Sequence, residues 1–318
     1  MASKLFYNDY RYWENFQPFF PERMRISQTN FPTEEFWQCN GNAIHLDKYY
    51  KTTSTKPIKI IVLHGGGGNG RVLSPIGIAL QNYGYKCILP DLPGFGLTIP
   101  SNKSILYNWW IDIIHQLVEE EYKKDGLPII LTGISLGGML AYQVACHTNK
   151  VIGVIATTLA DTRQKHVQEQ LSRYGFQAKF GNLLFSNNVT LLDSIKMPLP
   201  AFSKMHYVSN HDDLTKKMLN DTRGSGSWVP FSFFRSLFTT QPLIEPENFN
   251  NCPILLVHPE KDRMIPLEFS MPFFNKLAGT KEFVLLGNAG HIPIEQPGID
   301  QLETESLKFI SKLELQYQ

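Results

Sequence analysis

Apolar residues gather in short runs that alternate with helical patterns over most of the chain. Six runs are rich in β-branched residues and show no alternation with polar ones: Ile60–Leu63, Cys87–Leu89, Pro128–Leu131, Val151–Ile155, Ile254–Val257 and Phe283–Leu286. Runs of this kind are typical of strands that are covered on both faces. Each run therefore predicts a buried strand of a parallel sheet.

Between these runs, apolar residues recur at helical spacing. Ser74 followed by Pro75 indicates a helix start, with Ser74 as the N-cap and proline at the first helical position. Two longer sets of apolar residues at helical spacing predict further helices. The first, which stops near Gly126, consists of Leu106, Trp110, Ile113, Ile114 and Leu117. The second, close to the C-terminus, consists of Ile299, Leu302, Phe309, Ile310 and Leu313. The alternation of strands and helices implies an α/β fold with right-handed crossovers.

The alternation breaks once, between Asp161 and Asn251. This stretch is too long for a loop in a compact domain, so we expect a helical insertion. It carries aromatic, Leu and Met clusters: Phe180, Leu183–Phe185, Met197, Phe202, Trp228, Phe231, Phe233, Phe234 and Phe238. We expect a core formed by residues 1–160 and 247–318, with residues 161–246 inserted into it.

The first 23 residues are dense in aromatic side chains. Phe6, Tyr10, Trp13 and Gln17 fall on one helical stripe, which Pro18 is expected to end. Two interpretations stay open for this segment. It is either a short helix packed on the body of the protein, or an apolar flap near the substrate or a membrane surface.

Charge and cysteine content narrow the function classes. The 318 residues carry a formal net charge of +1, and this balance argues against nucleic acid as a partner. Cys39, Cys87, Cys146 and Cys252 form no C-x-x-C pair. We expect buried thiols with no disulfide or metal role.

No segment reaches the roughly 18 uninterrupted apolar residues that a membrane span needs. The N-terminal residues lack the apolar core of a secretory signal. We expect a soluble, cytoplasmic protein without stable membrane insertion. The sequence does not indicate an oligomeric state.

A candidate nucleophile follows the run Pro128–Leu131. There the sequence T-G-I-S-L-G-G contains G-x-S-x-G with Ser135 at its centre. Such a serine sits on a strained strand-to-helix turn, where flanking side chains would collide. Gly133 and Gly137 meet this need, and Gly138 allows the following helix to pack closely. We predict Ser135 as the nucleophile.

A serine hydroxyl needs a base, and imidazole suits that task. Among the nine histidines, His291 lies in G-N-A-G-H just past the last predicted strand, where a loop reaches the carboxyl edge of the sheet. His258 lies too close to the end of its own strand and is interpreted as local packing. We predict His291 as the base.

The imidazole in turn needs an acid that fixes its tautomer. Asp262, in H-P-E-K-D, follows the penultimate predicted strand, and the chain order Ser135, Asp262, His291 matches a known order of serine, acid and histidine in serine hydrolases. Two alternatives stay open. Asp161 follows the strand after the serine, and Glu260 lies two residues before Asp262.

The glycine-rich stretch H-G-G-G-G-N-G after the run Ile60–Leu63 has two interpretations. Gly65, Gly67 and Gly70 satisfy G-x-G-x-x-G, and Asp91 lies about 20 residues further on, as at a dinucleotide site. However, the next helix signal lies several residues beyond Gly70, whereas a dinucleotide-binding helix starts inside its glycine motif.

We therefore interpret this stretch as an oxyanion loop, whose glycines let backbone N–H groups approach a developing negative charge. The predicted donors are the N–H groups of Gly66 and Leu136. Gly65 and Gly67 remain alternatives to Gly66, and His64 is expected to brace the loop.

Together these motifs resemble the α/β-hydrolase superfamily. L-H-G-G, P-D-L-P-G-F-G, G-I-S-L-G-G, H-P-E-K-D and N-A-G-H occur in the family's order, within residues 60–160 and 250–312. The resemblance implies a mostly parallel central sheet with helices on both faces, and an inserted cap over the site. Within the superfamily, the chain looks like capped serine esterases, monoacylglycerol lipases and lysophospholipases.

The sequence thus predicts a serine hydrolase that cleaves carboxylic esters with an apolar acyl group and needs no metal or organic cofactor. The expected partner is a small apolar ester. The same triad also serves C–C bond hydrolases, lactonases and thioesterases, which remain alternatives. A non-catalytic binding protein on the same fold is a more distant one.

Overall fold

The computed structural model describes residues 4–51, 54–102, 105–173 and 193–317. An eight-stranded sheet forms its centre, in the order β1-β2-β4-β3-β5-β6-β9-β10. Five neighbouring pairs are parallel, and β1–β2 and β2–β4 are antiparallel. The strand bounds are Thr33–Cys39 (β1), Asn42–Tyr49 (β2), Lys59–Leu63 (β3), Lys86–Pro90 (β4), Ile129–Gly133 (β5), Val151–Ala156 (β6), Ile254–Pro259 (β9) and Lys281–Leu286 (β10).

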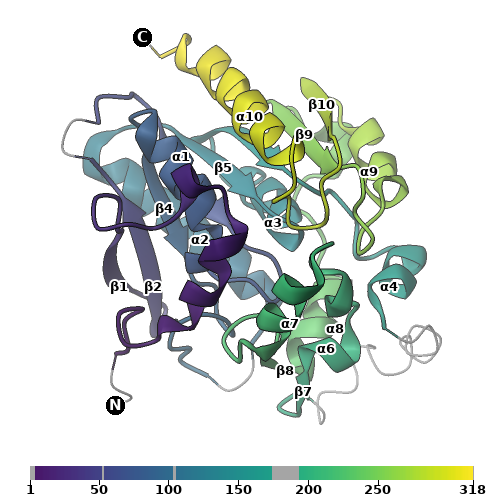
Figure 1. Ribbon diagram of the computed structural model, residues 1–318. Helices are drawn as coiled ribbons and strands as arrows, with labels where there is room; N and C mark the ends of the chain where they lie inside the picture. Colours follow the sequence, from purple (N-terminus) through teal and green to yellow (C-terminus); the bar gives the residue numbers. More distant parts are fainter. Residues whose placement is uncertain (1–3, 52–53, 103–104, 174–192, 318) are drawn as a thin grey trace.

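Helices cover both faces of this sheet (Figure 1). One face packs against α1 (Ser74–Asn82) and α10 (Gly298–Glu314), and the other against α2 (Tyr107–Asp125), α3 (Leu136–Ala145) and α9 (Met271–Lys276). Strands β3, β5 and β6 are buried along their whole length, because helices cover both faces of the sheet at these central strands. The predicted α/β fold with a mostly parallel sheet is confirmed.

Three details differ from the sequence prediction. The hairpin β1–β2 was not predicted, and it lies at one edge of the sheet. The run Phe283–Leu286 does form a strand, but at the opposite edge, where Phe283 and Leu285 are 40% and 41% exposed. Ser74 is itself the first helical residue of α1, with Leu73 as the N-cap.

The two longer predicted helices are confirmed. Helix α2 ends before Gly126, which adopts a left-handed conformation with φ 71° because glycine has no Cβ to clash there. Helix α10 carries the predicted C-terminal stripe on its buried side.

The chain between β6 and β9 contributes no strand to the large sheet in its described part. It forms α4 (Lys165–Leu171), α6 (Leu199–Phe202), η5 (Met205–Tyr207), α7 (Asp212–Asn220) and α8 (Phe231–Thr239), and ends with η6 (Pro246–Asn248). It also contains a short antiparallel ribbon of β7 (Lys196–Pro198) and β8 (Trp228–Pro230), so the insertion is not wholly helical. Its predicted apolar cluster at Phe180 and Leu183–Phe185 lies outside the described residues.

The N-terminal segment packs on the body of the protein. Residues Arg11–Phe19 form the 3-10 helix η1, and a further turn, η2, spans Glu22–Met24. Pro18 lies inside η1 and does not end it. Beyond the proline, the Phe20 N–H donates to the Gln17 carbonyl, in the i to i+3 pattern of a 3-10 helix. Buried aromatic side chains of this segment contact α7 and the body, which supports the packed interpretation.

Two short 3-10 turns complete the described elements, η3 (Arg71–Leu73) and η7 (Leu267–Phe269). All four cysteines are buried, as expected. Among the described residues, we find no helix with the length and apolar character needed to cross a lipid bilayer.

Candidate active site

Ser135 lies on a strained turn between β5 and α3. Its backbone has φ 57° and ψ −129°, a region that residues with a Cβ rarely adopt. Two threonines at the end of β6 hold the turn. The Ser135 N–H donates to the Thr157 hydroxyl at 2.8 Å, and the Thr158 hydroxyl donates to the Ser135 carbonyl at 3.0 Å. Sequence reasoning missed both threonines.

The glycines around Ser135 are required by close backbone packing. A Cβ at Gly133 would lie 2.0 Å from the Gly137 carbonyl oxygen, and one at Gly137 would lie 2.2 Å from the Leu63 carbonyl oxygen. A Cβ at Gly138 would lie 2.4 Å from the Thr158 carbonyl oxygen. The motif therefore lets α3 begin directly against β3 and β6 and present the serine hydroxyl at the apex.

The imidazole of His291 joins Ser135 to Asp262. Its Nε2 lies 2.8 Å from the Ser135 Oγ, and its Nδ1 lies 2.8 Å from the Asp262 Oδ2. These residues follow β5, β9 and β10, whose carboxyl ends meet at one edge of the parallel sheet. The structure thus brings the three predicted residues together in hydrogen-bonding geometry.

The contacts of the Asp262 carboxyl favour its ionised form, which accepts hydrogen bonds. Its Oδ1 accepts the N–H groups of Met264 and Ile265 at 2.9 and 2.8 Å. Burial by itself raises the pKa of this carboxyl, but the attraction and hydrogen bond of His291 and the Ile265 N–H outweigh it, so the pKa lies below its ordinary value. A carboxylate in this setting keeps the Nδ1–H tautomer of His291 and leaves Nε2 free to accept the serine proton.

The alternative acids and the alternative histidine lie elsewhere. Asp161 pairs with Arg163 at 2.8 Å. Glu260 accepts the Asn288 N–H at 2.8 Å and so steadies the loop that carries His291. His258 is buried within β9, and burial lowers its pKa, which agrees with a packing role.

The glycine loop lies directly beside Ser135. A Cβ at Gly65 would be 2.8 Å from the Ser135 Cβ, whereas a Cβ at Gly66 would meet nothing within 4 Å. Leu136 is the first residue of α3, so its N–H has no acceptor within the helix. Gly66, Ser135 and Leu136 line the same cavity, where two such N–H groups can approach a ligand oxygen.

His64 braces this loop. One ring nitrogen lies 2.7 Å from the Gly65 carbonyl oxygen, and the other accepts the Leu92 N–H at 2.9 Å. Burial lowers the pKa of His64, so the ring stays neutral and can both donate and accept. This is the bracing role predicted from the sequence.

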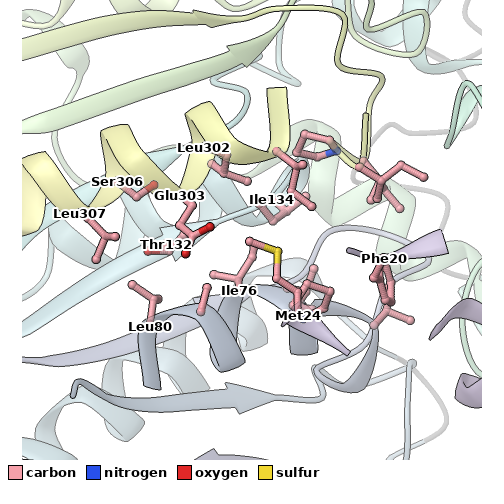
Figure 2. Close-up of a pocket in the computed structure, with 18 of the residues that line it drawn as sticks. Phe20, Met24, Ile76, Leu80, Thr132, Ile134, Leu302, Glu303, Ser306 and Leu307 are labelled. Atoms are coloured by element: carbon pink, nitrogen blue, oxygen red, sulfur yellow. The ribbon is translucent and has the colours of Figure 1, made fainter. Parts of the chain in front are cut away.

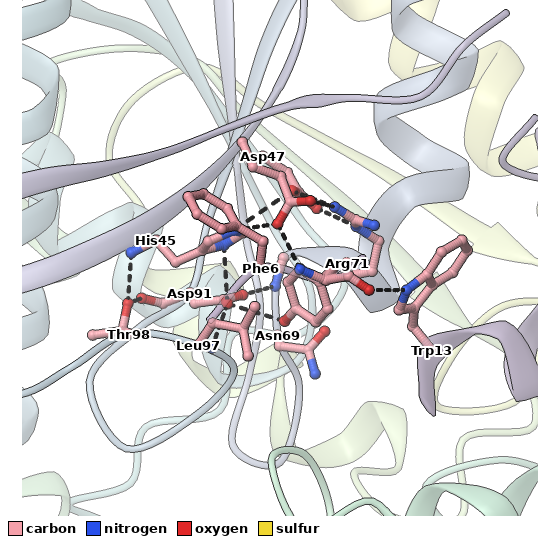
Figure 3. Close-up of polar contacts among 12 residues, drawn as sticks. Phe6, Trp13, His45, Asp47, Asn69, Arg71, Asp91, Leu97 and Thr98 are labelled. Atoms are coloured by element: carbon pink, nitrogen blue, oxygen red, sulfur yellow. Dashed lines mark hydrogen bonds and ion pairs between the residues drawn. The ribbon is translucent and has the colours of Figure 1, made fainter. Parts of the chain in front are cut away.

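Asp91 anchors the far end of the glycine loop (Figure 3). Its carboxylate accepts the N–H groups of Gly70 and Leu97, each at 2.7 Å, and the Tyr7 hydroxyl at 3.0 Å. The His45 Nδ1 lies 3.2 Å from the same carboxylate. Asp91 is thus fully buried and engaged, which leaves it unavailable to a ribose hydroxyl.

A buried charge cluster surrounds this anchor: Glu34, His45, Asp47, Arg71 and Asp91. Arg71 donates to both oxygens of Asp47 at 2.6 and 2.8 Å and lies 3.3 Å from Glu34. Ligand atoms of Glu34, His45 and Asp47 lie within 4.8 Å of one another, close enough to hold a metal ion. However, the guanidinium of Arg71 already supplies a cation to both carboxylates, so the donor set fits an ion-pair network better than a metal centre.

An apolar cavity of about 80 Å³ opens at Ser135. Its walls come from the glycine loop, from α3 and from the insertion, whose contribution includes Leu171, Leu199, Phe202, Met205, Phe234 and Leu237. Few polar side chains face it. The site can therefore accept an apolar group next to the serine hydroxyl.

Comparison with curated proteins gives partial matches. A thermostable monoacylglycerol lipase of Bacillus sp. (strain H-257) is 28% identical over 107 residues, which cover 33% of this chain and 41% of that protein. A pimeloyl-[acyl-carrier protein] methyl ester esterase of Legionella pneumophila (strain Corby) is 35% identical over 107 residues, covering 32% of this chain and 36% of that protein. The matched region thus spans about two fifths of these relatives' length.

Solved structures share the fold over nearly the whole chain. A soluble variant of a monoglyceride lipase from Saccharomyces cerevisiae superposes with a TM-score of 0.72 at 17% identity, covering 92% of this chain and 98% of that one. A monoacylglycerol lipase from Paleococcus ferrophilus gives 0.67 at 18% identity, covering 85% and 99%.

The family model described as the alpha/beta hydrolase family matches residues 60–299. This range runs from β3 to the start of α10 and includes the insertion as well as Ser135, Asp262 and His291. The chain belongs to the alpha/beta hydrolase family.

Proposed function

We propose that this protein is a serine hydrolase that cleaves carboxylic esters with an apolar acyl group through an acyl-enzyme. The observation that carries the proposal is the relay in which His291 lies 2.8 Å from both Ser135 and Asp262, at the mouth of an apolar cavity. The similarity to proteins named monoacylglycerol lipase and methyl ester esterase supports an ester as the substrate.

In the first half of the reaction, the His291 Nε2 takes the Ser135 proton while the Ser135 Oγ bonds to the carbonyl carbon. The carbonyl oxygen then carries the negative charge, and the N–H groups of Gly66 and Leu136 are proposed to stabilise it. When the C–O bond to the leaving alcohol breaks, His291 returns the proton to the alkoxide oxygen. The alcohol leaves, and the acyl group stays on Ser135.

In the second half, His291 takes a proton from water, and the water oxygen attacks the acyl carbon. The bond to the Ser135 Oγ breaks, the serine regains its proton, and the carboxylic acid is released. Asp262 keeps the imidazole oriented and balances its positive charge in both halves.

We also propose that residues 161–246 act as a cap on a core formed by residues 1–160 and 247–318. The apolar side chains that this insertion places around Ser135 support the proposal. They exclude water from the acyl group and select its shape.

The test is a substrate panel of p-nitrophenyl esters, lactones, thioesters and β-diketones, assayed with the wild-type protein and Ser135→Ala. We expect turnover of apolar esters that disappears in Ser135→Ala. Ser227→Ala, in the glycine- and serine-rich stretch of the insertion, is the matched control and should keep its activity. Turnover of lactones, thioesters or diketones without turnover of esters would overturn the substrate class. Activity that survives in Ser135→Ala would overturn the mechanism.

A further inference from the structure

A serine of the insertion donates a hydrogen bond to the glycine loop beside Ser135. The Ser225 hydroxyl donates to the Gly67 carbonyl oxygen at 3.0 Å, and both residues are buried. A Cβ at Gly67 would lie 3.1 Å from the Ser225 Cα, so the two segments pack closely. Ser225 is not among the described residues that line the cavity at Ser135. The contact therefore acts on the loop and not on the wall of the substrate cavity.

The glycine loop forms a turn at this contact. The Gly68 N–H donates to the Gly65 carbonyl at 3.1 Å, and Gly67, at the third position of the turn, has φ 81°. A positive φ at this position is typical of a type II turn and favours glycine. The Gly67 carbonyl that Ser225 contacts belongs to the same peptide unit as the Gly68 N–H, which closes the turn.

Two peptide units connect Ser225 to the proposed oxyanion donor. The C=O and N–H of a trans peptide unit lie in one plane and point in opposite directions. The unit between Gly67 and Gly68 accepts from Ser225 and donates to the Gly65 carbonyl. That carbonyl shares its peptide unit with the Gly66 N–H. The bonds thus fix the direction of this N–H, and each bond polarises the next.

Contacts with the core and the N-terminal segment fix the turn that carries Ser225. The turn begins at Asp221, whose carboxyl accepts the Tyr10 hydroxyl of the N-terminal segment at 2.6 Å. The Arg223 carbonyl accepts the Gly96 N–H, from the loop after β4, at 2.7 Å. The position of Ser225 against the glycine loop therefore depends on how the insertion sits on the core.

We propose that Ser225 is a positioning residue of the oxyanion hole, through which the insertion orients the Gly66 N–H toward the developing negative charge. The inference rests on the proposed function, because it assigns Ser225 a role in that same reaction. The His64 ring also contacts the Gly65 carbonyl, so loss of the Ser225 hydroxyl weakens the donor without removing it.

Ester kinetics of serine variants test this role. Ser225→Ala should lower kcat about tenfold, a part of the roughly 100- to 1,000-fold lost when an oxyanion donor is removed, and should keep KM within about twofold of wild type. Ser227→Ala is the matched control and should keep its kcat, because the Ser227 hydroxyl is also buried but has no partner in the described part of the chain. Ser225→Cys retains a weak donor, so its kcat should lie between those of Ser225→Ala and wild type.

Two inhibitors distinguish a weakened oxyanion hole from a distorted site. With a trifluoromethyl ketone, the Ser135 Oγ bonds to the carbonyl carbon, the serine proton passes to His291, and the ketone oxygen becomes an oxyanion. The matching methyl ketone binds as an unreacted carbonyl. Ser225→Ala should weaken binding of the trifluoromethyl ketone about tenfold and that of the methyl ketone less than about twofold. Titration with a fluorophosphonate counts the folded active sites of each variant.

Two results would overturn the inference. One is a kcat of Ser225→Ala, per active site, equal to that of Ser227→Ala. The other is an equal loss of affinity for the two ketones in Ser225→Ala. The proposed function would fail in a different way, through the absence of ester hydrolysis by the wild-type protein itself.

Discussion

The hydroxyl of Thr157 accepts the backbone N–H of Ser135 at 2.8 Å. This bond spans two adjacent strands of the sheet and ties the strained turn at the end of β5 to the end of β6. Because Ser135 has a φ of 57°, its backbone would relax toward a more common conformation without such restraints. The position of the serine hydroxyl thus depends on a residue outside the G-x-S-x-G motif.

Thr157→Val should therefore lower both stability and kcat. The half-buried Ser135 N–H would lose its partner, which costs about 1 kcal/mol, and the hydroxyl of Ser135 would shift relative to His291. Thr132→Val is the matched control, since it removes a buried hydroxyl that has no partner in the described part of the chain. Urea unfolding and ester kinetics measure the two effects. Equal behaviour of the two variants would contradict this role for Thr157.

Two adjacent glycines in the proposed oxyanion loop should differ strongly in their tolerance of alanine. Gly65→Ala places a Cβ 2.8 Å from the Ser135 Cβ, so the loop or the serine must move, and kcat should fall by about 100-fold. Gly66→Ala meets nothing within 4 Å and keeps its N–H, so its kcat should stay within a few-fold of wild type. Steady-state kinetics on one apolar ester compares them, and the prediction fails if Gly66→Ala is the more damaging change.

Asp262→Asn should impair catalysis with little loss of fold. An amide at this position can donate to His291, which favours the tautomer whose Nε2 carries a proton and cannot accept one from Ser135. In another serine hydrolase the corresponding change lowers kcat by roughly 10⁴-fold, and we expect an effect of that order. Glu260→Gln, two residues away, is the control and should retain most activity. An Asp262→Asn variant with near-normal kcat would point to a different acid.

The buried charge cluster predicts a loss of stability at alkaline pH. Burial lowers the pKa of His45, but Asp91, Glu34 and Asp47 outweigh it and raise that pKa to about 10. Between the ordinary histidine pKa of about 6.5 and about 10, the folded state holds a proton that the unfolded state has released. The free energy of unfolding therefore falls as pH rises through this window.

We expect the fall between pH 7 and 10 to be on the order of 2–4 kcal/mol, measured by urea unfolding at several pH values. His45→Gln cannot be protonated, so its stability should change less steeply over the same range. Parallel pH dependences of wild type and His45→Gln would show that His45 does not carry the proton.

Much of the α/β core could be predicted from the sequence because its signals are local. The runs that form β3, β5 and β6 are apolar throughout, and the end of α2 is marked by Gly126. The candidate relay could be located because Ser135, Asp262 and His291 each follow a predicted strand, and parallel strands bring their carboxyl ends to one edge.

Other features depend on partners far away in the chain. Strand β2 carries His45 and Asp47, which look like surface residues until Arg71 and Asp91 are placed beside them. The hydrogen bonds from Thr157 and Thr158 require the register between β5 and β6, which no local pattern reveals. An apolar cavity lined by Ile76 of α1, Thr132 of β5 and Leu302 of α10 (Figure 2) likewise forms only because α1 and α10, more than 200 residues apart, lie over the same face of the sheet.

The central claim is that Ser135 is the nucleophile of a relay through His291. Its most direct test is labelling with an alkyl fluorophosphonate, followed by peptide mass mapping. We predict one added phosphonyl group on the peptide that contains Ser135, much slower labelling in His291→Ala, and none in Ser135→Ala. A label on any other residue, or undiminished labelling of Ser135→Ala, would contradict the account.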